Sequence, residues 1–102
     1  MAFRLSYFKA AKDDVKEAKI WYHDQLPGLE KRFAKDLKNT IIRLQLNPYA
    51  FALRYEKFRI SHTDIFPYSI HFYIDNVANR IVIVGIVHDS RDNAFLKVRK
   101  KE

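Results

Sequence analysis

The chain has 102 residues, of which 48% are hydrophobic and 30% are charged, and it contains eight Phe, six Tyr and one Trp. This length fits one compact domain over residues 1–102 and excludes a second one. The aromatic content excludes a disordered chain. The formal net charge of +7 favours an acidic partner, such as nucleic acid or an acidic protein segment, although a basic protein without such a partner is the simpler alternative.

The sequence contains no cysteine, which excludes disulfides, thiolate nucleophiles and cysteine-based zinc sites. Its first residues do not form a basic region followed by a sustained apolar run. No stretch approaches the ~20 apolar residues that a membrane span needs. We therefore expect a cytoplasmic protein without a membrane partner.

The first half of the chain predicts a strand followed by two helices. Residues 3–8 alternate apolar and polar, which is typical of a strand buried on one face. Apolar side chains then recur at helical spacing over 10–25 and again over 29–46. Pro27 and Gly28 separate the two helices by only two residues, so the helices are expected to run back as an antiparallel hairpin.

The second half predicts three strands after a loop at 49–52. Alternating or continuous apolar runs place these strands at 53–62, 66–75 and 80–88. Residues 76–79 are expected to form the hairpin turn between the last two strands. Residues 92–98 are expected to add one or two turns of helix. The basic residues of the tail are interpreted as a solvated end: Lys97, Arg99, Lys100 and Lys101.

The element order β-α-α-β-β-β(-α) indicates an α+β fold, in which the helical hairpin packs on one face of a mostly antiparallel sheet. Leu37 and Phe72 are expected to meet between the two layers. The other face is expected to stay open, polar and basic. Alternate strand positions assign to it Lys57, Arg59, Ser61, Ser69, His71 and Tyr73.

Three kinds of site are unsupported by the residue pattern. The four histidines show no ligand-like spacing and no flanking acid cluster, so no metal is expected. The serines lie in no glycine-flanked turn of the kind that presents a nucleophile. With Gly28 and Gly85 as the only glycines, a glycine-rich phosphate loop is absent.

Metal-free RNA cleavage needs a base for the 2′-hydroxyl, an acid for the leaving oxygen, and cations around the phosphate. The groups that could converge on a phosphate are His88, Arg91, Arg59, Lys57 and His71. The alternative is a structured turn at 88–92, in which Arg91 pairs with a carboxylate and His88 bonds to backbone. Nucleic-acid binding without catalysis, with Tyr73 or His71 stacking on a base, also stays open.

Several local strings, in this order and at these separations, resemble the RelE/ParE superfamily of type II toxins over nearly the whole chain. They are Ala11-Lys12-Asp13-Asp14-Val15 with Ile20-Trp21-Tyr22, Phe33 through Leu44 to Asn47-Pro48, Arg59-Ile60 with Phe66-Pro67-Tyr68-Ser69-Ile70, and Val87-His88 with Arg91-Asp92. The resemblance implies a helical hairpin on a sheet, a cognate antitoxin as partner, and no cofactor. It also implies one of two activities. RelE-like members are ribosome-dependent mRNA endoribonucleases, and ParE-like members, which are plasmid stabilisation toxins, inhibit targets such as DNA gyrase.

The tail departs from the RelE pattern, because Ala94-Phe95-Leu96 stands where those ribonucleases offer a Tyr or a His-Tyr pair. Phe95 cannot exchange a proton, so a ParE-like inhibitor is expected rather than an enzyme. The contact surface for its target is expected at Lys57, Arg59, His71, Tyr73, His88 and Arg91. In the alternative, an mRNA endoribonuclease, the catalytic residues would be His88, Arg59 and Arg91.

Overall fold

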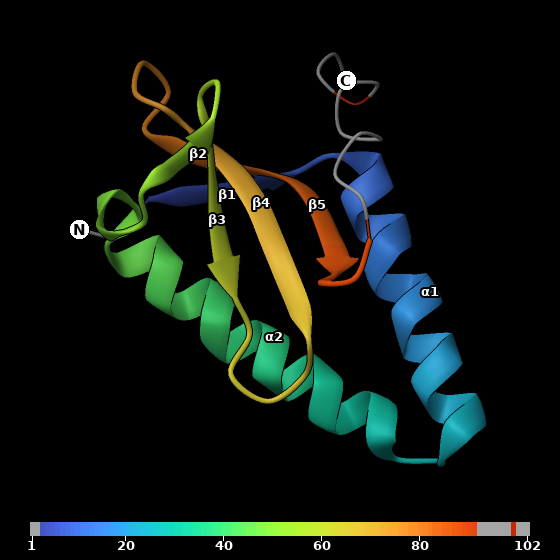
Figure 1. Ribbon diagram of the computed structural model, residues 1–102. Coiled ribbons are helices and arrows are strands. Elements are labelled where there is room, and N and C mark those ends of the chain that lie inside the picture. Colours follow the sequence, from blue (N-terminus) through green and yellow to red (C-terminus); the bar gives the residue numbers. More distant parts are fainter. Residues whose placement is uncertain (1–2, 92–98, 100–102) are drawn as a thin grey trace.

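The computed structural model describes residues 3–91 and residue 99. The elements follow in the order β1 (Arg4–Tyr7), α1 (Lys9–Gln25), α2 (Leu29–Leu46), a short 3-10 turn (Pro48–Ala50), β2 (Leu53–Tyr55), β3 (Phe58–His62), β4 (Tyr68–Asp75) and β5 (Arg80–His88). Figure 1 shows the two helices on one side of a twisted sheet, diverging from the tight turn that joins them. The α+β fold and the helical hairpin are as predicted. The helix expected at 92–98 lies outside the described residues.

The turn between the helices is as short as the sequence suggests. Gly28 has a φ of 101°, a left-handed conformation that favours glycine. Its N–H donates to the Glu30 carboxylate at 2.7 Å, which satisfies one of the unpaired donors at the start of α2. Both helices then present apolar side chains to the sheet.

The five strands lie in the order β1-β5-β4-β3-β2. β1 pairs with β5 in parallel, and every other neighbouring pair is antiparallel. The single strand expected at 53–62 was wrong, because a turn at Glu56 and Lys57 splits it into β2 and β3. Glu56 has a φ of 45°, which a continuous strand does not allow.

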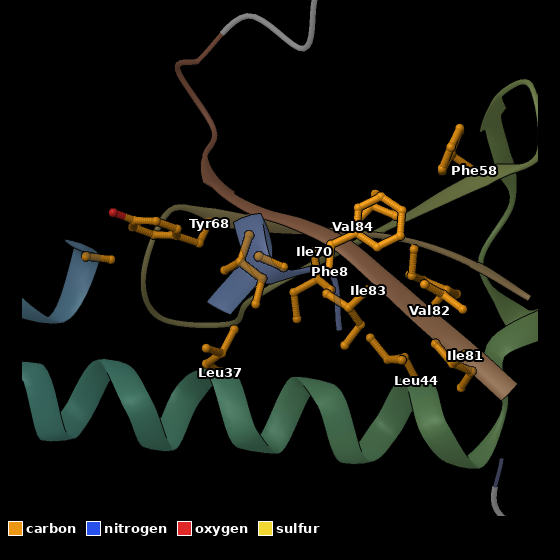
Figure 2. Close-up of a cluster of buried hydrophobic side chains, with 14 of the residues drawn as sticks. Phe8, Leu37, Leu44, Phe58, Tyr68, Ile70, Ile81, Val82, Ile83 and Val84 are labelled. Atoms are coloured by element: carbon orange, nitrogen blue, oxygen red, sulfur yellow. The ribbon is translucent and has the colours of Figure 1, made fainter. Parts of the chain in front are cut away.

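The core lies between the hairpin and the sheet. Figure 2 shows Leu37 and Leu44 pointing from α2 toward the sheet, where Ile81 and Ile83 of β5 meet them. Leu37 and Phe72 were expected in the core and are 5% and 0% exposed, and both belong to the apolar cluster between the two layers. Among the described residues, no helix combines the length and the apolar character that a membrane span needs.

The expected open face was partly wrong. Arg59 lies opposite Phe72 and Ser61 lies opposite Ile70, so Arg59 and Ser61 share the helix-facing side of the sheet with core residues. Ser61 is only 3% exposed. Alternation along a strand shows which of its residues share a face of the sheet. Which face of β3 matches which face of β4, however, depends on the register that the loop between them sets. On the open face β3 instead presents Ile60 and His62.

Candidate functional site

A pocket of about 350 Å³ opens on the uncovered face of the sheet, where β3 ends, β4 begins and β5 ends. Its walls combine basic, imidazole, hydroxyl and carboxylate groups: Arg54, Ile60, His62, Ser69, His71, Val87, His88, Asp89 and Arg91. We call it the open-face pocket. It joins residues from four separate segments of the chain, so no local sequence pattern outlines it.

Strand register brings the walls of this pocket together. His62 lies opposite Ser69, and Ser69 lies opposite Val87, the residue before His88. The loop between β3 and β4 is held from below by Asp36 of α2. Its buried carboxylate accepts the backbone N–H groups of residues 64, 65 and 66 at 3.2, 3.0 and 2.8 Å. Asp36 therefore sets where β3 ends and β4 starts, and with them the positions of His62 and Ser69.

One side of the pocket carries a chain of hydrogen-bonding groups. His62 Nδ1 lies 2.9 Å from Ser69 Oγ, and the Ser69 hydroxyl in turn donates to the Asp89 carboxylate in a short contact. His62 Nδ1 also lies 3.4 Å from Asp89 Oδ1. Because the hydroxyl has one proton and gives it to Asp89, His62 must be the donor to Ser69. The proton of a neutral His62 is thus held on Nδ1, and Nε2 keeps its lone pair.

The histidine at the end of β5 has the opposite arrangement. The backbone N–H of Ser90 donates to His88 Nδ1 at 3.1 Å, and the Ser90 hydroxyl lies 2.8 Å from the same nitrogen. A backbone N–H can only donate, so Nδ1 is an acceptor and the proton of His88 lies on Nε2. The alternative given for residues 88–92 was a structured turn in which His88 bonds to the backbone, and this hydrogen bond is confirmed.

His71 forms the floor of the pocket and is 1% exposed. Its Nδ1 lies 3.1 Å from the Tyr55 hydroxyl. Burial lowers the pKa of His71 to about 4, and the neighbouring His62 and Arg99 add to that effect. His71 is therefore neutral at physiological pH, and it contributes hydrogen-bonding capacity to the pocket rather than charge.

The groups that were expected to converge on a phosphate are brought together only in part. His71, His88 and Arg91 line the open-face pocket, but Lys57 and Tyr73 lie toward the other end of the sheet, with Lys57 Nζ 4.1 Å from the Tyr73 ring centre. That pair makes a cation–π contact.

The expectation for Arg59 was wrong. Its guanidinium donates to the Phe51 carbonyl at 2.6 Å and lies 5.3 Å from the Tyr49 ring centre, on the helix-facing side. It therefore holds the segment before β2 and contributes nothing to the pocket. Among the polar pocket residues, Arg54, His62 and Asp89 were missed from the sequence, and Ser69 was placed on the open face without a role in the site.

A second feature is an apolar groove on the opposite side of the molecule, in the V between α1 and α2, with β1 as its floor. Two adjoining cavities of about 400 and 310 Å³ form it. Both are lined by Tyr7, Val15, Leu37 and Ile41. Exposed lysines also line it: Lys12, Lys19 and Lys38. We call it the hairpin groove.

Arg99 was expected in a solvated end, and that expectation was wrong. Its guanidinium bonds both carboxylate oxygens of Asp14 in α1, at 2.7 and 3.0 Å, and donates to the Val84 carbonyl at 3.2 Å. The other tail residues lie outside the described part of the chain, including those at 94–96. Within the described part, no three His, Cys, Asp or Glu side chains are grouped so that they could hold a metal ion.

Comparisons with known proteins agree on one fold. A chain of the chromosomal ParDE toxin–antitoxin system from P. aeruginosa is similar with a TM-score of 0.74 and 18% identity, covering 85% of this chain and 96% of that one. The isolated E. coli RelE toxin aligns with a TM-score of 0.67 and 13% identity, covering 97% of each chain. A chain of the intact E. coli RelBE complex gives 0.66 and 13%, covering 88% of this chain and 100% of that one.

These low identities establish the fold alone. No curated protein sequence matches the chain. The sequence profile described as the ParE toxin of the type II toxin–antitoxin system parDE, however, matches residues 5–93, which include every helix and strand except the first residue of β1. The resemblance seen in the sequence is thus confirmed, and the chain belongs to the ParE toxin family of type II toxin–antitoxin systems.

Proposed function

We propose that this protein is a growth-arresting toxin of the ParE kind, which inhibits DNA gyrase by binding it and is neutralised by a cognate antitoxin. The observation that carries the proposal is the match of the ParE toxin profile over residues 5–93. The net charge of +7 suits a target that is itself bound to DNA. The open-face pocket, with Arg54 and Arg91 on its walls, is the proposed contact surface for that target.

Expression of the chain without an antitoxin is expected to arrest growth, and the purified protein is expected to trap gyrase–DNA cleavage complexes in a supercoiling assay.

Arg54→Ala and Arg91→Ala should weaken trapping roughly tenfold or more, because each removes a cation from the contact surface. Lys35→Ala, an exposed change on α2, is the matched control. Normal growth with verified soluble protein would refute the toxin proposal. An unaffected gyrase would remove the target and leave the family assignment intact.

The antitoxin is proposed to cover the hairpin groove. This groove is apolar along its floor and carries lysines at its margins, which fits an amphipathic helix whose polar face is acidic. The solved E. coli RelBE structure is a toxin–antitoxin complex, and another solved structure holds a RelE mutant with an antitoxin peptide. These neighbours support an antitoxin partner for the present chain.

A charge reversal at the margin of the groove tests this surface. Lys38→Glu is expected to weaken antitoxin binding about tenfold or more, since an acidic partner would then meet a like charge. Lys35→Glu changes the net charge equally but lies outside the groove lining, so it should bind nearly normally. Isothermal titration with the cognate antitoxin measures both. Equal weakening by the two variants would contradict the assignment of the groove.

A further inference from the structure

Tyr7 places a hydroxyl group in the apolar hairpin groove. The residue ends β1, and its side chain lines both cavities of the groove. Tyr7 is half-buried, and burial raises the pKa of Tyr7, so the hydroxyl keeps its proton and is available as a hydrogen-bond donor. Within residues 3–91 and residue 99, no hydrogen bond holds this hydroxyl.

The charged side chains around this hydroxyl are all basic. Lys12 lines the cavity of about 310 Å³ together with Tyr7, whereas Lys19 and Lys38 line the cavity of about 400 Å³. In the part of the chain that the structure describes, no Asp or Glu lines either cavity, and none of these lysines forms an ion pair. The Gln45 amide, the remaining polar side chain of the lining, donates to a backbone carbonyl at 2.6 Å. The groove therefore presents mainly proton donors to its occupant.

An occupant changes the surroundings of the Tyr7 hydroxyl. In the open groove, solvent water can bond to it. A helix that covers the groove excludes this water, and a hydroxyl buried without an acceptor opposes binding. The occupant must therefore bring an acceptor to this hydroxyl, within a stripe that otherwise packs on Val15, Leu37 and Ile41. A carboxylate suits this place better than a neutral carbonyl, because the lysines compensate its charge.

We propose that the antitoxin segment in the hairpin groove carries an Asp or Glu within its apolar stripe, and that this carboxylate accepts a hydrogen bond from Tyr7 and pairs with Lys12. This inference rests on the proposed assignment of the groove to the antitoxin, and it adds the chemistry by which the groove selects its partner. An antitoxin with an apolar residue at this position leaves the hydroxyl unbonded, and one with a basic residue meets the lysines. Tyr7 is thus a specificity-determining residue of this surface.

Tyr7→Phe tests the contact, since it removes only the hydroxyl and keeps the ring that lines the groove. Isothermal titration of the full chain with the cognate antitoxin is expected to show a loss of affinity of about tenfold or more. Tyr73→Phe removes a hydroxyl from β4, outside the groove lining, and is the matched control. Its affinity should equal that of the wild type. Thermal melting checks that both variants are folded.

The acid on the partner is identified by replacing each Asp and Glu of the antitoxin in turn with Leu. At one position the replacement should weaken binding to the wild-type chain and have a much smaller effect on Tyr7→Phe, because the two groups form one contact. The antitoxin with Leu at that position should bind Tyr7→Phe more tightly than it binds the wild-type chain. A groove that selects only apolar area would not reverse its preference in this way.

The inference is overturned if Tyr7→Phe binds the cognate antitoxin as tightly as the wild type does, or if no acidic residue of the antitoxin couples with Tyr7. Lys38→Glu, measured in the same titrations, separates this failure from that of the groove assignment. Weakened binding by Lys38→Glu beside unchanged binding by Tyr7→Phe would remove the Tyr7 contact and leave the antitoxin in the groove. Unchanged binding by both variants would remove the groove assignment and the inference together.

Discussion

His71 shows, at the scale of a single residue, how burial changes the role of a group that the sequence presents as a surface contact. His71 lies on the open face, as the sequence predicts, but its side chain is almost completely buried and bonds to the Tyr55 hydroxyl. Burial raises the pKa of Tyr55 to about 12, with Glu56 contributing, so that hydroxyl stays protonated. The pair is a neutral hydrogen-bonded unit beneath the charged groups of the pocket.

The stability of the fold should depend on pH because of His71. Its folded pKa is about 4, compared with 6.5 for an unperturbed histidine, so between these values the unfolded chain binds more protons. Stability contributed by neutral His71 is complete above pH 6.5 and is lost as the pH falls toward 4. The loss should amount to about 3 kcal/mol.

Urea unfolding of the wild type and of His71→Gln across pH 4 to 7 measures this effect. The variant cannot titrate at this position, so its stability should fall less over the same range, even if it is lower throughout. The groups that influence His71 besides burial are His62, Arg99, Asp89 and Asp14, and all are retained in the variant. Parallel pH curves for the two proteins would show that His71 is not responsible.

At the scale of elements, α1 and the chain end complete an edge of the sheet that no strand covers. β1 pairs with β5 from Arg80 to Ile83, and β5 continues beyond it to His88. Past that point, the Asp14 carboxylate accepts the Ile86 N–H at 3.0 Å, and Arg99 donates to the Val84 carbonyl. Two side chains thus satisfy backbone groups that a longer β1 would have paired.

The Asp14–Arg99 ion pair is expected to contribute strongly to stability, because the two side chains are only 8% and 17% exposed. Arg99→Ala leaves a buried carboxylate without its partner and should lower the free energy of unfolding by about 3 kcal/mol. Arg99→Lys should recover part of the loss, since it restores the charge without the paired geometry. Chemical denaturation measures both variants.

The exposed pair formed by Lys9 and Asp13, 3.6 Å apart, provides the comparison. Lys9→Ala should change stability by less than about 1 kcal/mol, because an exposed pair contributes little. If Arg99→Ala proved as mild as Lys9→Ala, the chain end would not be anchored at α1 in solution.

At the scale of the whole molecule, one apolar layer between hairpin and sheet holds every element. Tyr22 and Phe33 from the helices meet Phe66 and Tyr68 at one end of this layer, with ring centres 4.8 to 6.1 Å apart. Phe72 fills the middle and packs edge-on against Phe51. The layer therefore supports the strands that carry the open-face pocket on their other side.

Truncation of this layer should be severe. Phe72→Ala or Leu37→Ala is expected to lower the free energy of unfolding by about 2 to 5 kcal/mol, a large part of the roughly 5 to 15 that a domain has in total. Val77→Ala, at a fully exposed turn position, should change it by less than about 0.5 kcal/mol. Urea unfolding compares them, and a loss below 1 kcal/mol for Phe72→Ala would mean that the two layers pack loosely. Loss of toxicity in a core variant would reflect unfolding rather than a changed contact surface.

The sequence by itself determined the order of the elements, the hairpin, the α+β class and the family. These properties depend on periodicity, on breakers such as Pro27 and Gly28, and on local strings, all of which are local along the chain. It also named His71, His88 and Arg91, which the structure brings to the lining of one pocket. It missed the break at Glu56, because a left-handed residue other than glycine or asparagine gives little signal.

Tertiary structure decided which face each strand presents and which residues meet. The structure places Arg59 on the helix-facing side of the sheet and His62 on the open face, contrary to the prediction. The reason is that the register between strands depends on the loop that Asp36 holds and on the bulge between β4 and β5. A shift of one residue exchanges the two faces, and alternation within a strand cannot report it. The pocket shared by His62, Ser69, Asp89 and His88, and the anchoring of Arg99, are consequences of that register and packing.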